Sequence, residues 1–249
     1  MSIEGPSDWI GLRDVARIVR RILADVGAHV RPGVTTAELD QIAERVLVEE
    51  GARSAPALTY GFPGNVLVSI NEEVVHGVPG RRKIVRGDLV SIDVTVEKAG
   101  FVADAARTIV LDGASDLARR LAACADSALE AGLTVARAGT PVNEIGRAVE
   151  TEVHRCGFVV VRGLSGHGVG RTIHEWPDVP NEYNARQRDI LTEGLVLTIE
   201  PMICASGGRT VVGKDGWTVR TRDGSLAAHA EHTLVITTDR PVILTANAA

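Results

Sequence analysis

Apolar residues recur at two different spacings along the first 111 residues. A spacing of three and four predicts two helices, and the second is expected to begin at Thr35, which stands three residues before Glu38 in a capping-box arrangement. Segments rich in β-branched residues predict strands, whereas residues 57–78 are typical of strand and loop. The expected helices are residues 9–30 and 35–50, and the expected strands are residues 89–96 and 101–111.

The same order of helices and strands returns in the second half of the chain. Residues 116–135 predict an amphipathic helix. Thr140-Pro141 supplies an N-cap followed by proline at the first position of another helix, which is expected to end near Cys156-Gly157. Strand-like segments follow at residues 159–161, 194–200 and 231–237.

An internal repeat supports one domain with two similar halves. At an offset of 107 residues, Leu89-Val90-Ser91-Ile92-Asp93 falls on Val196-Leu197-Thr198-Ile199-Glu200, so an acid ends an apolar strand in both halves. No linker rich in proline, serine or charge separates the halves. We therefore expect an α+β fold in a single domain over residues 1–249, with pseudo-repeated helix–helix–strand halves at about 8–112 and 114–240.

Composition narrows the class of protein. The chain is 45% hydrophobic, which is enough for a sizeable core, and its net charge of -5 disfavours binding to the phosphate backbone of nucleic acids. The three cysteines form no CxxC motif and are expected to be buried free thiols of a reducing compartment. The sequence shows neither a signal peptide nor an apolar run of transmembrane length, so a cytoplasmic location is expected.

Two aspartates stand on strands that a short turn connects. If Lys98-Ala99 forms the centre of the turn, Asp93 lies directly opposite Asp104, with Cβ atoms roughly 4.5–5.5 Å apart. Two like charges in that position repel each other and are costly to desolvate. Either one carboxylate turns outward to solvent, or a divalent cation between the two removes the repulsion. The hairpin alone leaves both interpretations open.

The second half supplies further candidate ligands. His167 stands among glycines in Gly166-His167-Gly168-Val169-Gly170, where backbone can approach a ligand closely. Glu200 follows one apolar strand and Glu231 precedes another. Each of these residues alone has an ordinary structural explanation, such as a strand-end salt bridge. Together with the two aspartates they could hold two adjacent divalent ions, with some carboxylates bridging.

Motifs over nearly the whole chain resemble those of type I methionine aminopeptidases, a family of metallopeptidases with the pita-bread fold. Two of the matching runs are Gly166-His167-Gly168-Val169-Gly170-Arg171 and Thr198-Ile199-Glu200-Pro201-Met202. The others are residues 69–72, 75–79, 87–88, 92–94, 174–175, 214–218 and 230–233. The resemblance implies two pseudo-symmetric halves around a curved antiparallel sheet.

The resemblance also implies five protein ligands for two divalent ions per chain. The first ion would be held by His167, Glu200, Asp104 and Glu231, and the second by Asp93, Asp104 and Glu231. Donor sets of oxygen and nitrogen accept cobalt, manganese, iron or zinc, so the identity of the ions stays open.

Catalytic and substrate-binding roles follow from the same resemblance. Glu200 would carry a proton as well as bind metal, and His76 and His174 would contact the substrate amide and the tetrahedral intermediate. A pocket for the methionine side chain would be lined by Tyr60, Phe62, Ile173 and Trp217, for which ordinary core packing is the alternative. Leu67 and Val75 replace cysteines that are common in the family, a departure that affects pocket shape rather than chemistry.

The implied activity is removal of the initiator methionine before a small second residue, by attack of a metal-activated water on the first peptide bond. Expected partners are N-terminal methionyl peptides and nascent chains, with no membrane and no specific nucleic acid, and the protein is expected to be a monomer. Arg81-Arg82-Lys83 and Arg119-Arg120 leave contact with the ribosome open, although a solvated surface is the simpler interpretation.

Three alternative classes of protein use the same fold. Xaa-Pro aminopeptidases and dipeptidases share the five ligands but generally carry a large additional N-terminal domain, for which 249 residues leave no space. Type II methionine aminopeptidases carry an insertion, against which the 26 positions from His174 to Glu200 argue. Non-catalytic binding modules have lost metal ligands, whereas all five are present in this sequence.

Overall fold

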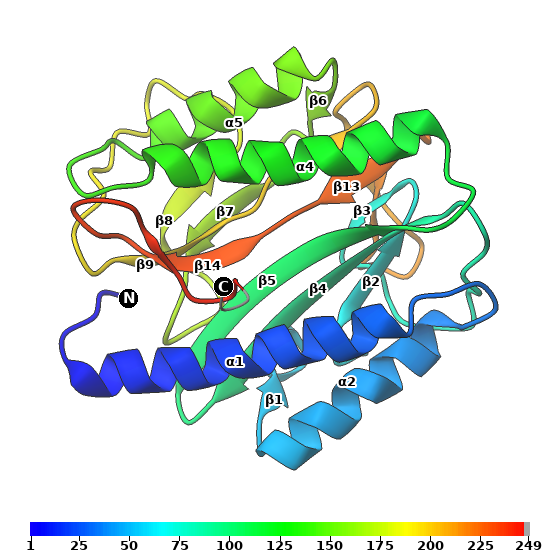
Figure 1. Cartoon of the computed structure of the whole chain (residues 1–249), viewed down its shortest axis with the longest axis horizontal. Helices are drawn as coiled ribbons and strands as arrows, with labels where there is room; N and C mark the ends of the chain where they lie inside the picture. Colours follow the sequence, from blue (N-terminus) through cyan, green and yellow to red (C-terminus); the bar gives the residue numbers. More distant parts are fainter. Residues whose placement is uncertain (247–249) are drawn as a thin grey trace.

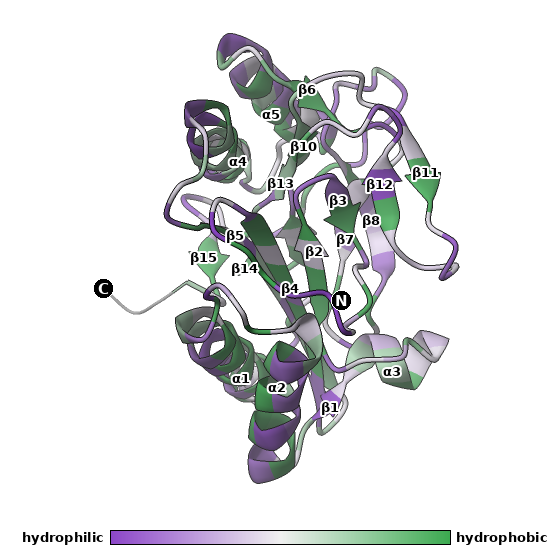
Figure 2. Cartoon of the chain, turned by 90° about the vertical axis from the view of Figure 1, so that its right-hand side faces the viewer, coloured by the Kyte–Doolittle hydropathy of each residue, from purple (hydrophilic) through white to green (hydrophobic). Residues whose placement is uncertain are grey.

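Two pairs of helices pack against antiparallel sheets in the structure, a computed structural model that describes residues 1–246. The pairs are α1 (Pro6–Ala28) with α2 (Thr36–Glu50), and α4 (Asp116–Val135) with α5 (Asn143–Arg155). The pairs lie above and below the long strands in Figure 1, and Figure 2 shows all four helices on the same side of the sheets. The four long helices thus cover one face and leave the other face to loops, short strands and one short helix.

Local sequence signals explain most helix ends. The capping box at the start of α2 is confirmed, because the Thr35 side chain accepts from the Glu38 N–H and the Glu38 carboxylate accepts from the Thr35 N–H. The expected N-cap at Thr140 is wrong, since α5 begins at Asn143. Pro141 instead forms a β-bridge with Ile190, and this contact keeps Thr140-Pro141 outside the helix.

A short helix, α3 (Ala55–Tyr60), occupies part of the stretch that was expected to be strand and loop. The Ser54 hydroxyl accepts from the Ala57 N–H, and Pro56 stands in the first turn, where its missing N–H costs nothing. Gly61 ends the helix in the left-handed conformation. This helix lies across the sheet from the four long helices (Figure 2).

Every named strand pair within residues 1–246 is antiparallel. The sheet of the first half contains β1 (Arg53–Ser54), β2 (Leu67–Ile70), β4 (Leu89–Lys98) and β5 (Phe101–Val110). The sheet of the second half contains β7 (Ser165–Gly168), β8 (Glu175–Pro180), β9 (Val196–Ile199), β14 (His232–Val235) and β15 (Val242–Ile243). Two smaller sheets contain β3 (Glu73–Val75), β11 (Thr210–Val212) and β12 (Val219–Thr221), and β6 (Val159–Val160), β10 (Met202–Cys204) and β13 (Ala227–His229).

The turn of the β4–β5 hairpin is centred one residue later than expected, which shifts the pairing of the two strands by two positions. Its central residues are Ala99 and Gly100, both with positive φ (51° and 79°), as a two-residue turn of type I′ requires. Asp93 therefore lies opposite Ala106 and Asp104 opposite Thr95, so the expectation that the two aspartates face each other directly is wrong. A shift of two positions preserves the face of the sheet, and the aspartates remain diagonal neighbours on it. Asp93 also lies within β4 rather than at its end.

The two halves meet along β5 and β14, which Figure 1 shows crossing the middle of the molecule. The Asp104 N–H donates to Thr233 Oγ1 at 2.9 Å, and the Thr233 hydroxyl donates to the Asp104 carbonyl at 2.7 Å. The Glu231 N–H donates to the Ala106 carbonyl at 2.9 Å. Because these bonds join backbone and buried side chains, they fix the second half against the first beside the predicted ligands.

Each helix pair has its own buried apolar core. The predicted single domain covers residues 1–249, of which 247–249 lie outside the described residues, and it stays a prediction. Cys124 and Cys204 are buried and Cys156 is partly buried, and all three are free thiols. Among the described residues, no helix combines the length and the apolar character needed to cross a bilayer.

Candidate metal centre

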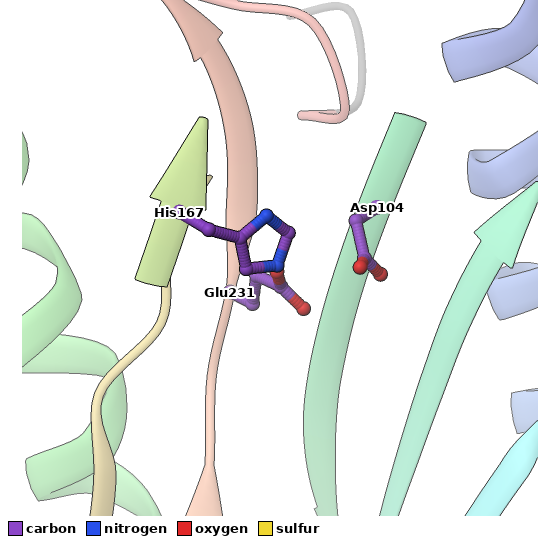
Figure 3. A group of neighbouring side chains, drawn as sticks. All are labelled: Asp104, His167 and Glu231. Carbon is purple, nitrogen blue, oxygen red and sulfur yellow. The ribbon is translucent and has the colours of Figure 1, made fainter. Parts of the chain in front are cut away.

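Carboxylates and one imidazole from both halves converge on the face opposite the helices. Asp104 comes from β5, His167 from β7 and Glu231 from the residue before β14, and Figure 3 shows their side chains pointing toward one another. Each offers one ligand atom, and the three atoms lie within 4.8 Å of one another. Glu200 joins them from the end of β9, with its Oε1 3.3 Å from His167 Nε2. Asp93 lies on β4, as a diagonal neighbour of Asp104 on β5.

The His167 ring is held in the tautomer that a metal ligand needs. Its Nδ1 lies 3.0 Å from the Gly168 carbonyl oxygen, which can only accept, so Nδ1 carries the proton and Nε2 keeps its lone pair. Burial, followed by the neighbouring His174, lowers the pKa of His167 to about 4. A neutral ring with a free Nε2 therefore faces the carboxylates at neutral pH.

Thr198 connects His167 to Glu200. Its Oγ1 accepts from the His167 N–H at 3.1 Å, and its hydroxyl donates to Glu200 Oε1 at 2.7 Å. The amide of Asn181 donates to the Glu200 carbonyl at 3.0 Å. These bonds hold the first carboxylate oxygen of Glu200 beside the imidazole and leave Oε2 for other contacts.

The negative charges of the four carboxyl groups are poorly balanced by the protein groups around them. Burial raises the pKa of Asp93, Glu200 and Glu231 well above their usual range, and the charges of neighbouring carboxylates raise it further. Burial also raises the pKa of Asp104 to about 6, although hydrogen bonds from Thr95 and Asp93 oppose this rise.

The uncompensated oxygens fit a divalent cation. Asp93 Oδ1, Asp104 Oδ1 and Glu231 Oε1 are buried and make no hydrogen bond within the described residues. Buried oxygens without partners are costly, and positive charge among them would satisfy them and remove their mutual repulsion. Carboxylate oxygens with one imidazole nitrogen are a donor set that divalent transition metals accept. The residues present therefore fit a metal centre.

Every residue predicted for the site lines one cavity of about 180 Å³. The predicted ligands Asp93, Asp104, His167, Glu200 and Glu231 line it, together with Thr95. The other predicted members of the lining are His76, His174, Tyr60, Phe62, Ile173 and Trp217. Leu67 and Val75 line the same cavity, so the two departures from the family lie where they can change its shape.

The apolar wall of the cavity has a defined geometry. Phe62 and Trp217 pack edge to face, with ring centroids 5.3 Å apart and planes at 89°, an arrangement that aromatic pairs favour. Phe62 and Ile173 are almost fully buried, whereas about half of Tyr60 is exposed. A narrow apolar recess with a more open rim follows from this arrangement.

Two further histidines stand at the edge of the carboxylate cluster. The His174 ring packs against His167 with centroids 4.3 Å apart, and its Nδ1 is hydrogen-bonded to the Tyr60 hydroxyl. His76 follows β3 in the left-handed conformation, with φ 60°. Non-glycine residues with positive φ are strained and gather at functional positions. Burial lowers the pKa of both His76 and His174, so both rings are neutral at neutral pH.

Three residues of the site were missed in the sequence. Thr95 and Thr198 are ordinary strand residues in the sequence, and only the register places their hydroxyls on Asp104 and Glu200. His229 lies with its Nε2 3.8 Å from Glu200 Oε2 and 3.9 Å from Glu231 Oε2. Its spacing of two from Glu231 was a usable signal, since alternate residues of an extended chain share a face. Burial lowers the pKa of His229 to about 3.

The fold and this donor set together indicate a metal-dependent peptidase. Residues 11–238 match the model of metallopeptidase family M24. Methionine aminopeptidase 2 of Bacillus subtilis is 40% identical over 247 residues, which cover 98% of this chain and 99% of the relative. The chain belongs to metallopeptidase family M24, and the predicted resemblance to methionine aminopeptidases is confirmed.

Solved structures agree with this assignment. The structure of methionine aminopeptidase from Thermotoga maritima superposes with a TM-score of 0.95 at 32% identity, covering 99% of this chain and all of that one. Prolidase from Pyrococcus furiosus superposes with a TM-score of 0.79 at 22% identity, and this chain covers 66% of it. The second likeness shows the fold alone. The predicted α+β pita-bread fold is thus confirmed.

Proposed function

We propose that this chain is a methionine aminopeptidase that holds two divalent ions and removes N-terminal methionine before a small second residue. The observation that supports this most strongly is one cavity that joins the carboxylate–histidine cluster to a narrow apolar recess. The relative that is 40% identical along nearly its entire length adds the substrate class. In this proposal the first ion is held by His167, Glu200, Asp104 and Glu231, and the second by Asp93, Asp104 and Glu231.

Divalent ions held by these residues would supply a water of lowered pKa and polarisation of the scissile carbonyl. Glu200 is the proposed proton carrier between water and the leaving amine. Burial raises the pKa of Glu200 above its usual range, which favours a carboxyl group that accepts a proton and then donates it. The Thr198 hydroxyl on Oε1 fixes the orientation of the Glu200 carboxyl group while Oε2 exchanges the proton.

The two neutral histidines are proposed to bind the reacting amide. With the Tyr60 hydroxyl donating to Nδ1 of His174, Nε2 carries the proton and can donate to an oxygen that gains negative charge. His76 lines the same cavity from the position after β3 and is the proposed partner of the substrate amide. Phe62, Ile173 and Trp217 would receive the methionine side chain, with Tyr60 at the rim. Asp93 is placed to attract the free α-amine that an exopeptidase must recognise.

The proposed substrates are methionyl peptides and nascent chains, which are found in the cytoplasm. We also propose that the exposed cluster Arg81-Arg82-Lys83 contacts the ribosome and that the protein acts as a monomer.

A peptide assay tests the proposal directly. The metal-free protein, prepared with a chelator, would be supplied separately with cobalt, manganese, iron or zinc and mixed with Met-Gly-Met-Met. We expect release of free methionine only after metal is added, and much slower release from Met-Lys-Met-Met, whose second residue is large. Hydrolysis in a sample verified to be metal-free, or hydrolysis of a Xaa-Pro dipeptide alone, would contradict the proposed function.

A further inference from the structure

His229 is a buried imidazole without a partner. It ends β13 with only 1% of its surface exposed, and neither Nδ1 nor Nε2 makes a hydrogen bond within the described residues. A buried polar group left unpaired loses its hydrogen bonds to water without replacing them, which destabilises the folded protein. Such a group in a well-packed interior indicates that something else completes its bonding, and the surroundings of the ring show what that is.

The ring lies beside two of the predicted metal ligands. Nε2 is 3.8 Å from Glu200 Oε2 and 3.9 Å from Glu231 Oε2, which is too far for hydrogen bonds. Two donors bound to one transition-metal ion at about 2.0–2.2 Å stand roughly 3–3.6 Å apart. The observed spacing exceeds this by a few tenths of an ångström, which small side-chain rotations can supply. The three donor atoms lie within 4.8 Å of one another.

The two histidines flank the Glu200 carboxylate. His167 Nε2 is nearest to Oε1, at 3.3 Å, and His229 Nε2 is nearest to Oε2, at 3.8 Å. Glu200 therefore has an imidazole beside each of its oxygens. Only one of these two histidines belongs to the five predicted ligands.

The backbone holds His229 in this position from the other half of the molecule. Its N–H donates to Thr108 Oγ1 at 2.9 Å, and its carbonyl accepts from the Thr108 hydroxyl at 2.8 Å. Thr108 belongs to β5, the strand that also carries Asp104. The ring is thus aimed at the carboxylates by rigid strands, as a preorganised ligand requires.

We propose that His229 is a sixth protein ligand of the metal centre, through Nε2, to a divalent ion that Glu200 and Glu231 also hold. This inference rests on the proposed metal centre and adds a second nitrogen donor to it. A second imidazole favours cobalt, iron and zinc over manganese and magnesium, which prefer oxygen ligands. The centre should therefore discriminate against the latter ions more strongly than a centre with one imidazole.

Cobalt(II) is the probe that tests the assignment. In the cobalt-loaded wild-type protein, each ring bound through Nε2 gives one strongly shifted, exchangeable Nδ1–H proton resonance, and we expect two, from His167 and His229. In His229→Gln we expect one such resonance and a Co²⁺ affinity lower by at least ~10-fold, measured by calorimetry. His154→Gln is the matched control, because His154 is exposed on α5, and it should keep both resonances and the wild-type affinity.

A single shifted resonance in the wild-type protein would overturn the inference, and this measurement does not depend on whether the variant folds. Two resonances and unchanged affinity in His229→Gln would overturn it as well. Hydrolysis of Met-Gly-Met-Met, measured on the same samples, separates the two proposals. Hydrolysis with only one shifted resonance would contradict the sixth ligand but not the proposed function. Two shifted resonances without hydrolysis would contradict the proposed function but not the sixth ligand.

Discussion

Glu200 carries more of the proposed chemistry than any other side chain, and its contacts are distributed over different atoms. Thr198 bonds Oε1, Asn181 bonds the backbone oxygen, and Oε2 faces His229. A substitution that keeps the shape of Glu200 can therefore remove its charge without removing the contacts that position it.

Glu200→Gln should lower kcat/KM for a methionyl peptide by at least ~100-fold and weaken metal binding, because an amide neither carries a proton nor supplies negative charge. The amide oxygen can still accept from Thr198, so the fold should be preserved, which circular dichroism would check. Glu193→Gln, at an exposed glutamate, is the matched control and should behave as wild type. Activity of Glu200→Gln within about tenfold of wild type would contradict the assigned role.

Metal affinity should rise with pH above the usual titration range of carboxyl groups. The pKa of Asp93, Glu200 and Glu231 is raised in the metal-free protein, so these groups still hold protons there that an incoming ion must displace. Raising the pH removes those protons beforehand. The pKa of His167 is lowered to about 4, so this ring is neutral throughout and does not oppose the trend. Calorimetric titration in buffers of different ionisation enthalpy would count the released protons, and binding without proton release would exclude this explanation.

The β4–β5 hairpin shows how a turn controls the distance between two candidate metal ligands. Ala99 occupies the first central position with φ 51°, a conformation that asparagine and glycine tolerate better than alanine. The turn sets Asp93 and Asp104 as diagonal rather than direct neighbours. That separation leaves space for an ion and still keeps both carboxylates on one face.

Replacing Ala99 with Asn should raise the free energy of unfolding of the metal-free protein by about 0.5–1 kcal/mol. Urea denaturation measures the effect. Ala99→Val is the opposing control, since a β-branched residue fits this conformation poorly and should destabilise the hairpin. Equal stability of the two variants would mean that this turn does not have the described conformation in solution.

The sequence allowed the long helices, the hairpin strands and the candidate ligands to be predicted, because apolar periodicity and recurrent motifs are local signals. It did not allow the register of β4 with β5 to be predicted, since either of two dipeptides, Lys98-Ala99 or Ala99-Gly100, can be drawn at the turn. The prediction that both aspartates lie on one face of the sheet still holds, because a shift of two positions does not change the face. The start of α5 was missed for a different reason, namely that Pro141 is bound by a distant strand.

Contacts between distant parts of the chain also limited which residues of the site could be predicted from the sequence. Thr198 meets His167, and His229 meets Glu200, only when strands that are distant in the sequence pack together, although each also stands two positions from a candidate ligand. The five candidate ligands could be picked out in the sequence because each stands in a distinctive motif, and their role as ligands stays a prediction. The roles of His76, His174 and the apolar lining residues stay predictions, although the structure places all of them around one cavity.

The contact between the two halves is maintained by few buried polar groups, of which Thr233 is central. Thr233→Val keeps the volume but leaves the N–H and the carbonyl of Asp104 without partners. We expect the free energy of unfolding to fall by about 1–3 kcal/mol, together with a loss of metal affinity as Asp104 becomes free to move. Thr192→Val, at an exposed threonine, is the matched control for urea unfolding and calorimetry. An unchanged affinity would show that Asp104 is positioned by β4 alone.

The contact of the two halves along β5 and β14 also means that the predicted ligands are divided between two separate stretches of the chain. Asp93 and Asp104 precede the loop between β5 and α4, whereas His167, Glu200 and Glu231 follow it. Cleavage within residues 112–115 would yield two fragments, neither of which contains all five predicted ligands. Reassembly of the fragments would then be recorded by the return of bound cobalt, making the split chain a complementation pair with a metal as its reporter.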